Sequence, residues 1–157
     1  MNCTRRLAAL PLLVLLSACV GVETGTFNAG QPPPQGSFAG LINAERSGHA
    51  LGPLANEARL ATAAQGHADD MSIRGYFSHV SANGDTLGDR MSATGYNFCW
   101  AGENIAQGYA TPAAVFSAWM NSQGHRDNML SALPSEFGLG HAPSGNYWVL
   151  VLAQPGC

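Results

Sequence analysis

The sequence contains few charged residues. Only 11% of its 157 residues are Asp, Glu, Lys or Arg, the net charge is −3, and no basic run is longer than Arg5-Arg6. Proteins that bind nucleic acids carry basic patches that neutralise phosphates. The apolar run at residues 7–16 is interrupted by Pro11 and is too short to cross a bilayer as a helix. We therefore expect no nucleic-acid partner, and we do not interpret this run as a membrane span.

The N-terminal segment, residues 1–18, has the composition of a secretory signal peptide. A basic pair precedes the apolar run, as such signals require. The segment ends in LSAC, which resembles a bacterial lipobox, with Leu16 at its first position and Cys19 at its last. The resemblance implies cleavage before Cys19 and acylation of that residue. An ordinary signal peptide followed by a chance cysteine is the alternative.

The lipobox resemblance implies an exported lipoprotein that is held to a membrane through Cys19. Residue 20 is Val, not the aspartate that retains many lipoproteins at the inner membrane. In a cell with two membranes we therefore favour the outer one, with the folded part facing the periplasm or the exterior. Residues 19–37 contain GQPPPQGS and predict an extended tether. Residues 38–157 remain for one domain, which we expect to be monomeric.

Cysteine is also scarce, with four residues in the chain. Cys3 leaves with the signal peptide and Cys19 carries the lipid. Cys99 and Cys157 then remain in an exported domain, where oxidising conditions favour disulfides. We expect these two to pair, and two free thiols are the alternative.

The apolar patterns predict helices first and strands last. The regular stripe of the second helix includes His67, which we interpret as a core residue. The order of elements is typical of an α+β fold with an antiparallel sheet. Helices are predicted over residues 38–48, from Asn56 as cap to Gly75, over 87–94, from the Thr111 cap through Met120, and over 124–131; strands are predicted over 101–108, 136–142 and 147–153.

Five motifs are similar to those of a known family. Residues 41–151 resemble the CAP (SCP-like) superfamily, which includes cysteine-rich secretory proteins, venom antigen 5 and plant pathogenesis-related proteins, and its bacterial branch in particular. The resemblance implies an α–β–α sandwich with a small antiparallel sheet between helical layers. The motifs are INAER, FSHVSANGDTLGDR, GENIAQGY, AWMNSQGHRDNML and FGLGHA…YWVLVLA.

The family resemblance implies a cleft lined by two histidines and two acidic residues. The histidine of the SH motif is His79, the glutamate of the GEN motif is Glu103, and the histidine of the GH motif is His125. The second acidic residue of animal and plant members lies three places after a tryptophan. Here Trp119 is followed at that distance by Ser122, so one of the four polar groups carries no charge.

Two interpretations of these residues stay open. His79, Glu103 and His125 are a reasonable ligand set for a divalent metal, zinc or magnesium, with open positions for water. Alternatively, Glu103 bonds one or both histidines in a cluster that only shapes the cleft. Asn104 is expected to satisfy backbone groups beside Glu103.

The remaining histidines and two arginines are interpreted as structural. His49 lies in a glycine-bounded turn and is expected to be solvated. His141 lies near the last hairpin turn and is expected at the surface. Arg90 and Arg126 are expected to form ion pairs or to bond carbonyl groups.

The sequence favours a non-catalytic binding module of the cell envelope. Members of the family have been linked to lipid, sterol and divalent-metal binding, so a metal or lipid-like ligand is expected. A hydrolase is the alternative, either metal-assisted or built from Ser122, His125 and Glu103. Ser122 lies in the segment NSQGH and has no nucleophile-elbow motif around it, so we expect no catalytic residues.

Overall fold

The computed structural model describes residues 37–157, so the predictions for the signal peptide, Cys19 and the tether lie outside the described residues. Within residues 37–157, no helix is both long and apolar enough to cross a membrane. The helices are α1 (Phe38–Gly48), α2 (Ala58–Arg74), α3 (Leu87–Ala93), α4 (Pro112–Met120) and α5 (Gln123–Met129). The strands are β1 (Ala55–Asn56), β2 (Phe98–Gln107), β3 (Glu136–Ala142) and β4 (Tyr147–Pro155).

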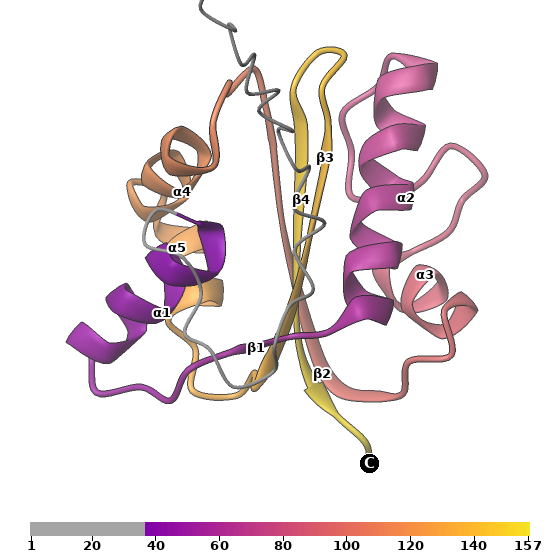
Figure 1. Cartoon of the computed structure of the whole chain (residues 1–157). Helices are drawn as coiled ribbons and strands as arrows, with labels where there is room; N and C mark the ends of the chain where they lie inside the picture. Colours follow the sequence, from indigo (N-terminus) through magenta and orange to yellow (C-terminus); the bar gives the residue numbers. More distant parts are fainter. Residues whose placement is uncertain (1–36) are drawn as a thin grey trace, which may run out of the picture. The chain divides into compact units, whose positions relative to one another are not determined.

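The sheet lies between two helical layers. Figure 1 shows α1, α4 and α5 on one face and α2 and α3 on the other. Strand β4 is buried on both faces because its side chains alternate between two cores. Val149 and Val151 pack in the core under α2 and α3, whereas Trp148 and Leu150 pack in the core under the other helices. The arrangement confirms the α–β–α sandwich.

The strand order is β1-β3-β4-β2, so β2 is an edge strand. Strand β4 pairs antiparallel with both β2 and β3, as predicted from the hairpin and from the family resemblance. The short strand β1 was not predicted and pairs parallel with β3, with Ala55 opposite Glu136. A two-residue strand is too short to produce a periodic pattern, which explains why the sequence did not reveal it.

Most helix ends follow the predicted capping residues. Ser37 accepts from the Gly40 backbone N–H at the start of α1, and Thr111 caps α4 ahead of its first-turn proline. The prediction that Asn56 caps α2 was wrong by one residue. Glu57 is the N-cap, because Asn56 belongs to β1.

Helix α2 approaches β3 through two glycines, Gly138 and Gly140. A Cβ atom on Gly140 would overlap backbone atoms of Ala64 and Gln65 in α2. This close approach allows the Gln65 side chain to pair with strand backbone. Its amide oxygen accepts from the His141 N–H at 2.9 Å, and its amide nitrogen donates to the His141 carbonyl at 3.0 Å.

A buried arginine on the opposite side connects α1 to the end of α5. The Arg46 guanidinium donates to the carbonyl oxygens of Gly52 at 2.9 Å, Met129 at 2.8 Å and Ser131 at 2.8 Å. Met129 ends α5, and carbonyl groups at a helix end lack partners within the helix. Arg46 therefore supplies donors that α5 cannot supply itself.

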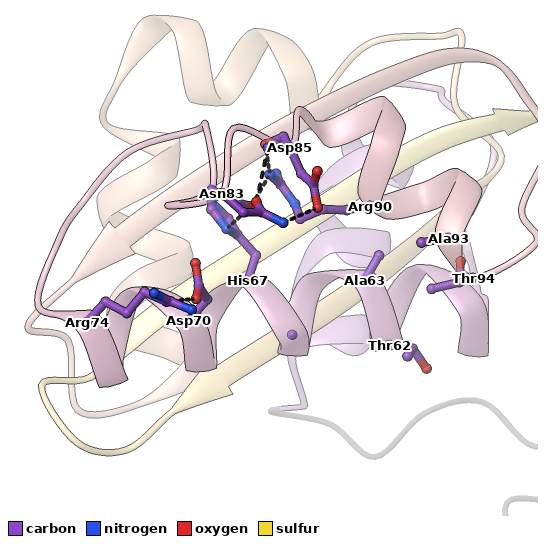
Figure 2. A pocket seen from close by; sticks show the side chains of 12 residues that line it. Thr62, Ala63, His67, Asp70, Arg74, Asn83, Asp85, Arg90, Ala93 and Thr94 are labelled. Carbon is purple, nitrogen blue, oxygen red and sulfur yellow. Dashed lines mark hydrogen bonds and ion pairs between the residues drawn. The ribbon is translucent and has the colours of Figure 1, made fainter.

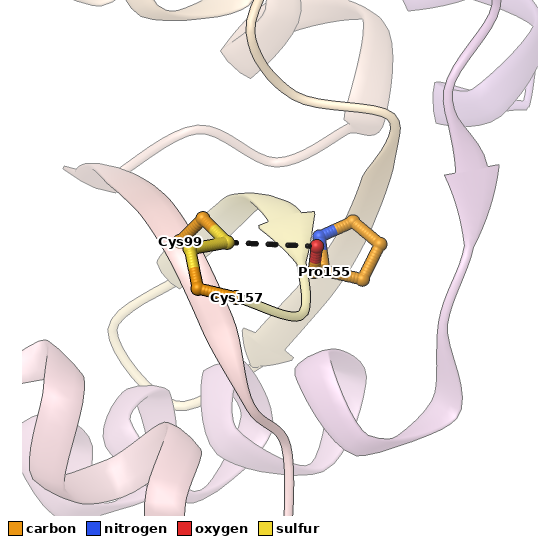
Figure 3. Close-up of a disulfide and its surroundings, with 3 residues drawn as sticks. All are labelled: Cys99, Pro155 and Cys157. Atoms are coloured by element: carbon orange, nitrogen blue, oxygen red, sulfur yellow. Dashed lines mark hydrogen bonds between the residues drawn. A yellow bond between two sulfur atoms is a disulfide. The ribbon is translucent and has the colours of Figure 1, made fainter.

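Cys99 and Cys157 form a disulfide, as predicted (Figure 3). Their Cα atoms are 5.2 Å apart, although 58 positions separate them in the sequence. The bond joins the beginning of β2 to the C-terminus. It therefore fixes one end of the edge strand that carries Glu103.

We expect loss of this disulfide to destabilise the domain. In the chain-entropy model, opening a loop of 58 positions costs at most about 4 kcal/mol of unfolding free energy. The measurement is urea unfolding of the protein and of its Cys99→Ser/Cys157→Ser variant. Intact-mass analysis after alkylation without reductant provides the control, and two labelled thiols in the parent protein would contradict the bond.

Candidate functional site

Glu103 is a buried carboxylate with both oxygens paired. Its side chain is 4% exposed, although β2 is an edge strand. Oε1 accepts from Nδ1 of His79 at 2.7 Å, and Oε2 accepts from Nη2 of Arg90 at 2.6 Å. A buried carboxylate is costly unless it is paired. The partners explain how an acidic side chain is tolerated at a buried position of β2.

His79 lies in the loop of residues 75–86 between α2 and α3. Its side chain is 58% exposed, so the imidazole connects buried Glu103 to solvent. An ionised carboxylate only accepts hydrogen bonds, so the proton of the neutral imidazole lies on Nδ1. Nε2 of His79 is therefore left with a lone pair.

His125 lies on α5, and Asn104 fixes its backbone. Adjacent residues of a strand point to opposite faces, so Glu103 points toward α3 and Asn104 points toward α5. The buried Asn104 amide donates to the His125 carbonyl at 3.0 Å and accepts from Asn128 at 2.9 Å. Asn104 therefore satisfies a backbone group of α5, in addition to its position beside Glu103.

The surroundings of His125 favour its neutral form. Burial and, to a lesser extent, the charge of nearby His79 lower the pKa of His125. Protonation of His125 is thus opposed both by desolvation and by repulsion. Both effects keep this imidazole available as an acceptor at neutral pH.

The structure places Ser122 at the N-cap position of α5. Its hydroxyl makes no capping hydrogen bond, and its backbone carbonyl accepts from Arg126 at 2.9 Å. In the hydrolase alternative, Glu103 would orient His125, as the acidic member of a catalytic triad orients its histidine. The Glu103 carboxylate instead bonds His79 and Arg90.

The three predicted metal-ligating residues are not grouped around one point. Within residues 37–157, no three His, Cys, Asp or Glu side chains are placed to hold a metal ion together. Glu103 is a poor direct ligand here because the Arg90 cation and His79 occupy its oxygens. A carboxylate in this position suits the orientation of a ligating histidine, since metal-bound imidazoles commonly donate their second N–H to one.

Two further histidines have structural contacts. His67 is buried, as predicted, and its Nε2 donates to the Ser78 carbonyl at 2.8 Å. Burial, followed by the charge of Arg90, lowers the pKa of His67. His141 stacks on Trp148 with 3.8 Å between ring centroids.

The predicted roles of His49 and the two arginines are also observed. His49 is exposed and lies 3.3 Å from Glu45. Arg126 donates to the Met120 carbonyl, and Arg90 pairs with Glu103 and bonds carbonyl groups. The sequence did not indicate that Arg90 would bond the site carboxylate itself. The one available signal was that Arg90 ends the same motif that contains His79.

A cavity of about 340 Å³ lies between α2, α3 and the loop of residues 75–86 (Figure 2). It adjoins the candidate site without containing it, since His79, Glu103 and His125 are absent from its lining. Arg90 belongs to both. The cavity is lined by Thr62, Ala63, Gly66, His67, Asp70, Arg74, Ser81, Asn83, Asp85, Arg90, Ala93 and Thr94.

The family model for the cysteine-rich secretory protein (CAP) family matches residues 39–154, which is most of the chain. The chain belongs to the CAP family. Its relatives include the uncharacterized protein YkwD from Bacillus subtilis, which is 41% identical over 108 residues. Another is the uncharacterized membrane protein YlbC from the same species, which is 39% identical over 100 residues.

The matched segments of these CAP relatives are part of longer chains. The match covers 69% of this chain and 42% of YkwD, and 64% of this chain and 29% of YlbC. The present chain thus spans less than half the length of the curated relatives it matches. The similarity concerns the CAP domain.

Solved structures share the fold of this chain. An extracellular protein containing an SCP domain from Bacillus anthracis superposes with a TM-score of 0.71 at 36% identity, covering 74% of this chain and 39% of that one. An outer surface protein from Borrelia burgdorferi superposes with a TM-score of 0.70 at 19% identity, covering 76% and 90%. The second likeness supports the CAP fold alone.

Proposed function

We propose that this CAP domain is an exported, membrane-anchored binding module of the cell envelope that performs no catalysis. The observation that carries the proposal is the pairing of Glu103. Both of its oxygens are bonded to His79 and Arg90, so the carboxylate does not orient His125 for attack by Ser122 and is not free to act as a general base itself. The exposed His79 imidazole then serves as a contact for a ligand.

Relatives support the location in this proposal. The Bacillus anthracis neighbour is described as extracellular, the Borrelia burgdorferi neighbour as an outer surface protein, and YlbC as a membrane protein. We propose that the ligand is a component of the envelope, lipid-like in character. Such a molecule is accessible to a domain held beside a membrane.

The test is to incubate the purified protein with an envelope lipid extract and to analyse bound and free molecules by mass spectrometry. We expect bound molecules of unchanged mass, and reduced binding in the His79→Ala variant. His49→Ala is the matched control, because His49 is also an exposed histidine bonded to a glutamate. Pairs of lighter products whose masses add up to a starting lipid plus one water would contradict the proposal and indicate a hydrolase.

The anchor in the proposal is the lipid on Cys19. Acyl chains contribute about 0.8 kcal/mol per buried methylene, and more than one chain gives stable membrane attachment. We expect Cys19→Ser to move the protein from the membrane fraction to the soluble fraction. Detergent partitioning of both proteins measures this, and a Cys19→Ser variant that still enters the detergent phase would exclude lipid anchoring.

Metal binding at this site is a second part of the proposal. His79 and His125 would be the ligands, with zinc preferred over magnesium because imidazole suits zinc. Glu103 would orient His79 through its Nδ1–H instead of ligating the metal. A bound zinc would supply a positive centre for an anionic ligand group.

The affinity for zinc should decrease as the pH decreases. Only a neutral imidazole binds metal, so protons compete as pH falls through about 6.5. Because the pKa of His125 is lowered, protons compete with zinc for this residue only at a lower pH than for an ordinary histidine. Titration calorimetry at neutral and acidic pH is the measurement. Equal affinity at both pH values, or in the His79→Ala variant, would leave the cluster with a structural role only.

A further inference from the structure

Arg90 joins the candidate site to the loop that carries His79. It lies on α3, and its side chain is 9% exposed. Nη2 donates to the Glu103 carboxylate at 2.6 Å. Nη1 lies 3.2 Å from the His79 carbonyl, 3.0 Å from Oγ of Ser81 and 3.1 Å from the Asp85 carbonyl. A single guanidinium therefore contacts both the edge strand and the loop.

The loop is held on both sides of His79, by His67 before it and by Arg90 after it. Ser78, just before it, has its carbonyl held by the buried His67 at 2.8 Å. Ser81, two residues after it, accepts from Arg90, and its hydroxyl oxygen lies 3.3 Å from Nδ1 of His67. Figure 2 shows the Arg90 side chain, which comes from α3, beside Asp85 of this loop. The loop has no helix or strand of its own here, so these contacts define its path.

We infer that Arg90 is a positioning residue, which fixes the His79 imidazole against Glu103 by holding the loop and the carboxylate with one side chain. The inference deepens the proposed function. The importance of this positioning for ligand binding rests on that function. A planar guanidinium presents several N–H groups in a rigid fork, so it holds acceptors in different directions together. A lysine ammonium has the same charge without this fork.

A simpler role for Arg90 is that of a counter-ion. Glu103 is buried, and any nearby cation would offset part of its desolvation. The two roles differ in what a lysine would preserve. Lysine at position 90 keeps a positive charge for Glu103 but cannot reproduce the bonds to the carbonyls of His79 and Asp85.

The test is NMR of the histidine side chains in the full-length protein, at mildly alkaline pH where imidazole is neutral. In the parent protein we expect His79 to carry its proton on Nδ1, because the Glu103 carboxylate accepts from that atom. The signature to be measured is this Nδ1-protonated form of His79. In the Arg90→Lys variant we expect its loss, with ring signals like those of a free imidazole. A His79 signature unchanged in Arg90→Lys would overturn the positioning role and leave a counter-ion.

Two further variants complete the experiment. Arg90→Met removes both the charge and the fork, and it should lose the signature as well as stability. If that variant does not fold, Arg90→Lys carries the test. Arg59→Lys is the matched control, because Arg59 also pairs with a glutamate, Glu57, while its side chain is 51% exposed. The signature is read without any ligand, so a failed lipid screen would overturn the proposed function and leave this inference intact.

Discussion

Gly140→Ala should destabilise the domain by about 3 kcal/mol or more, because the new Cβ overlaps backbone atoms. The overlapping atoms belong to Ala64 and Gln65 of α2, and a helix backbone cannot move aside as a side chain can. Helix α2 would have to shift away from β3. That shift would also separate Gln65 from the His141 backbone. Thermal unfolding followed by circular dichroism measures the effect, with an expected fall in melting temperature of roughly 10 °C.

The matched control is Gly66→Ala. Gly66 lies in α2 itself, and a Cβ at this position meets nothing within 4 Å. Alanine is favoured over glycine within a helix by about 1 kcal/mol, so we expect unchanged or increased stability. Equal stability for Gly140→Ala and Gly66→Ala would mean that the α2–β3 contact is not tight in solution.

Arg46→Met should cost about 3 to 5 kcal/mol of unfolding free energy, through the loss of donors to buried carbonyl groups. Methionine fills a similar volume but leaves the carbonyls of Gly52, Met129 and Ser131 without this partner. Because Met129 ends α5, we also expect faster amide hydrogen exchange in α5, the helix that carries His125. Urea unfolding and exchange measured by mass spectrometry are the tests.

Arg74→Met serves as the comparison for Arg46. Arg74 pairs with Asp70 at 2.6 Å, but its side chain is 61% exposed. Exposed ion pairs contribute at most about 1 kcal/mol, so the change should be small. If Arg46→Met lowers the free energy of unfolding no more than Arg74→Met does, the bonds of Arg46 do not contribute measurably to stability.

Sequence patterns predicted α1 to α4 because each has a capping residue, an apolar stripe or a terminating glycine. Gly75, for example, has a φ of 69° and ends α2 where the pattern required it. The buried strand β4 was recognisable as a continuous apolar run. Strand β1 was not recognisable, because its two residues are held by pairing with β3 and their side chains form no pattern of their own.

The candidate site was predictable only in part. His79, Glu103 and His125 were identified through the family resemblance, and the pair of His79 and Glu103 was one of two open interpretations. The sequence alone did not reveal that Glu103 also bonds Arg90, since that bond depends on how α3 packs beside β2. It also did not reveal that Asn104 bonds the His125 backbone, which depends on the position of α5.

The edge strand β2 has a consequence for proteins that are crowded on a surface. A free strand edge invites pairing with the same edge of a second molecule and can lead to aggregation. Two carbonyl groups of β2 are already occupied by side chains. The Trp119 indole donates to the Ile105 carbonyl at 3.2 Å, and the Asn128 amide lies 3.4 Å from the Glu103 carbonyl. Helices α4 and α5 thus occupy acceptors that an incoming strand would need, which opposes the addition of a strand from a second, crowded copy.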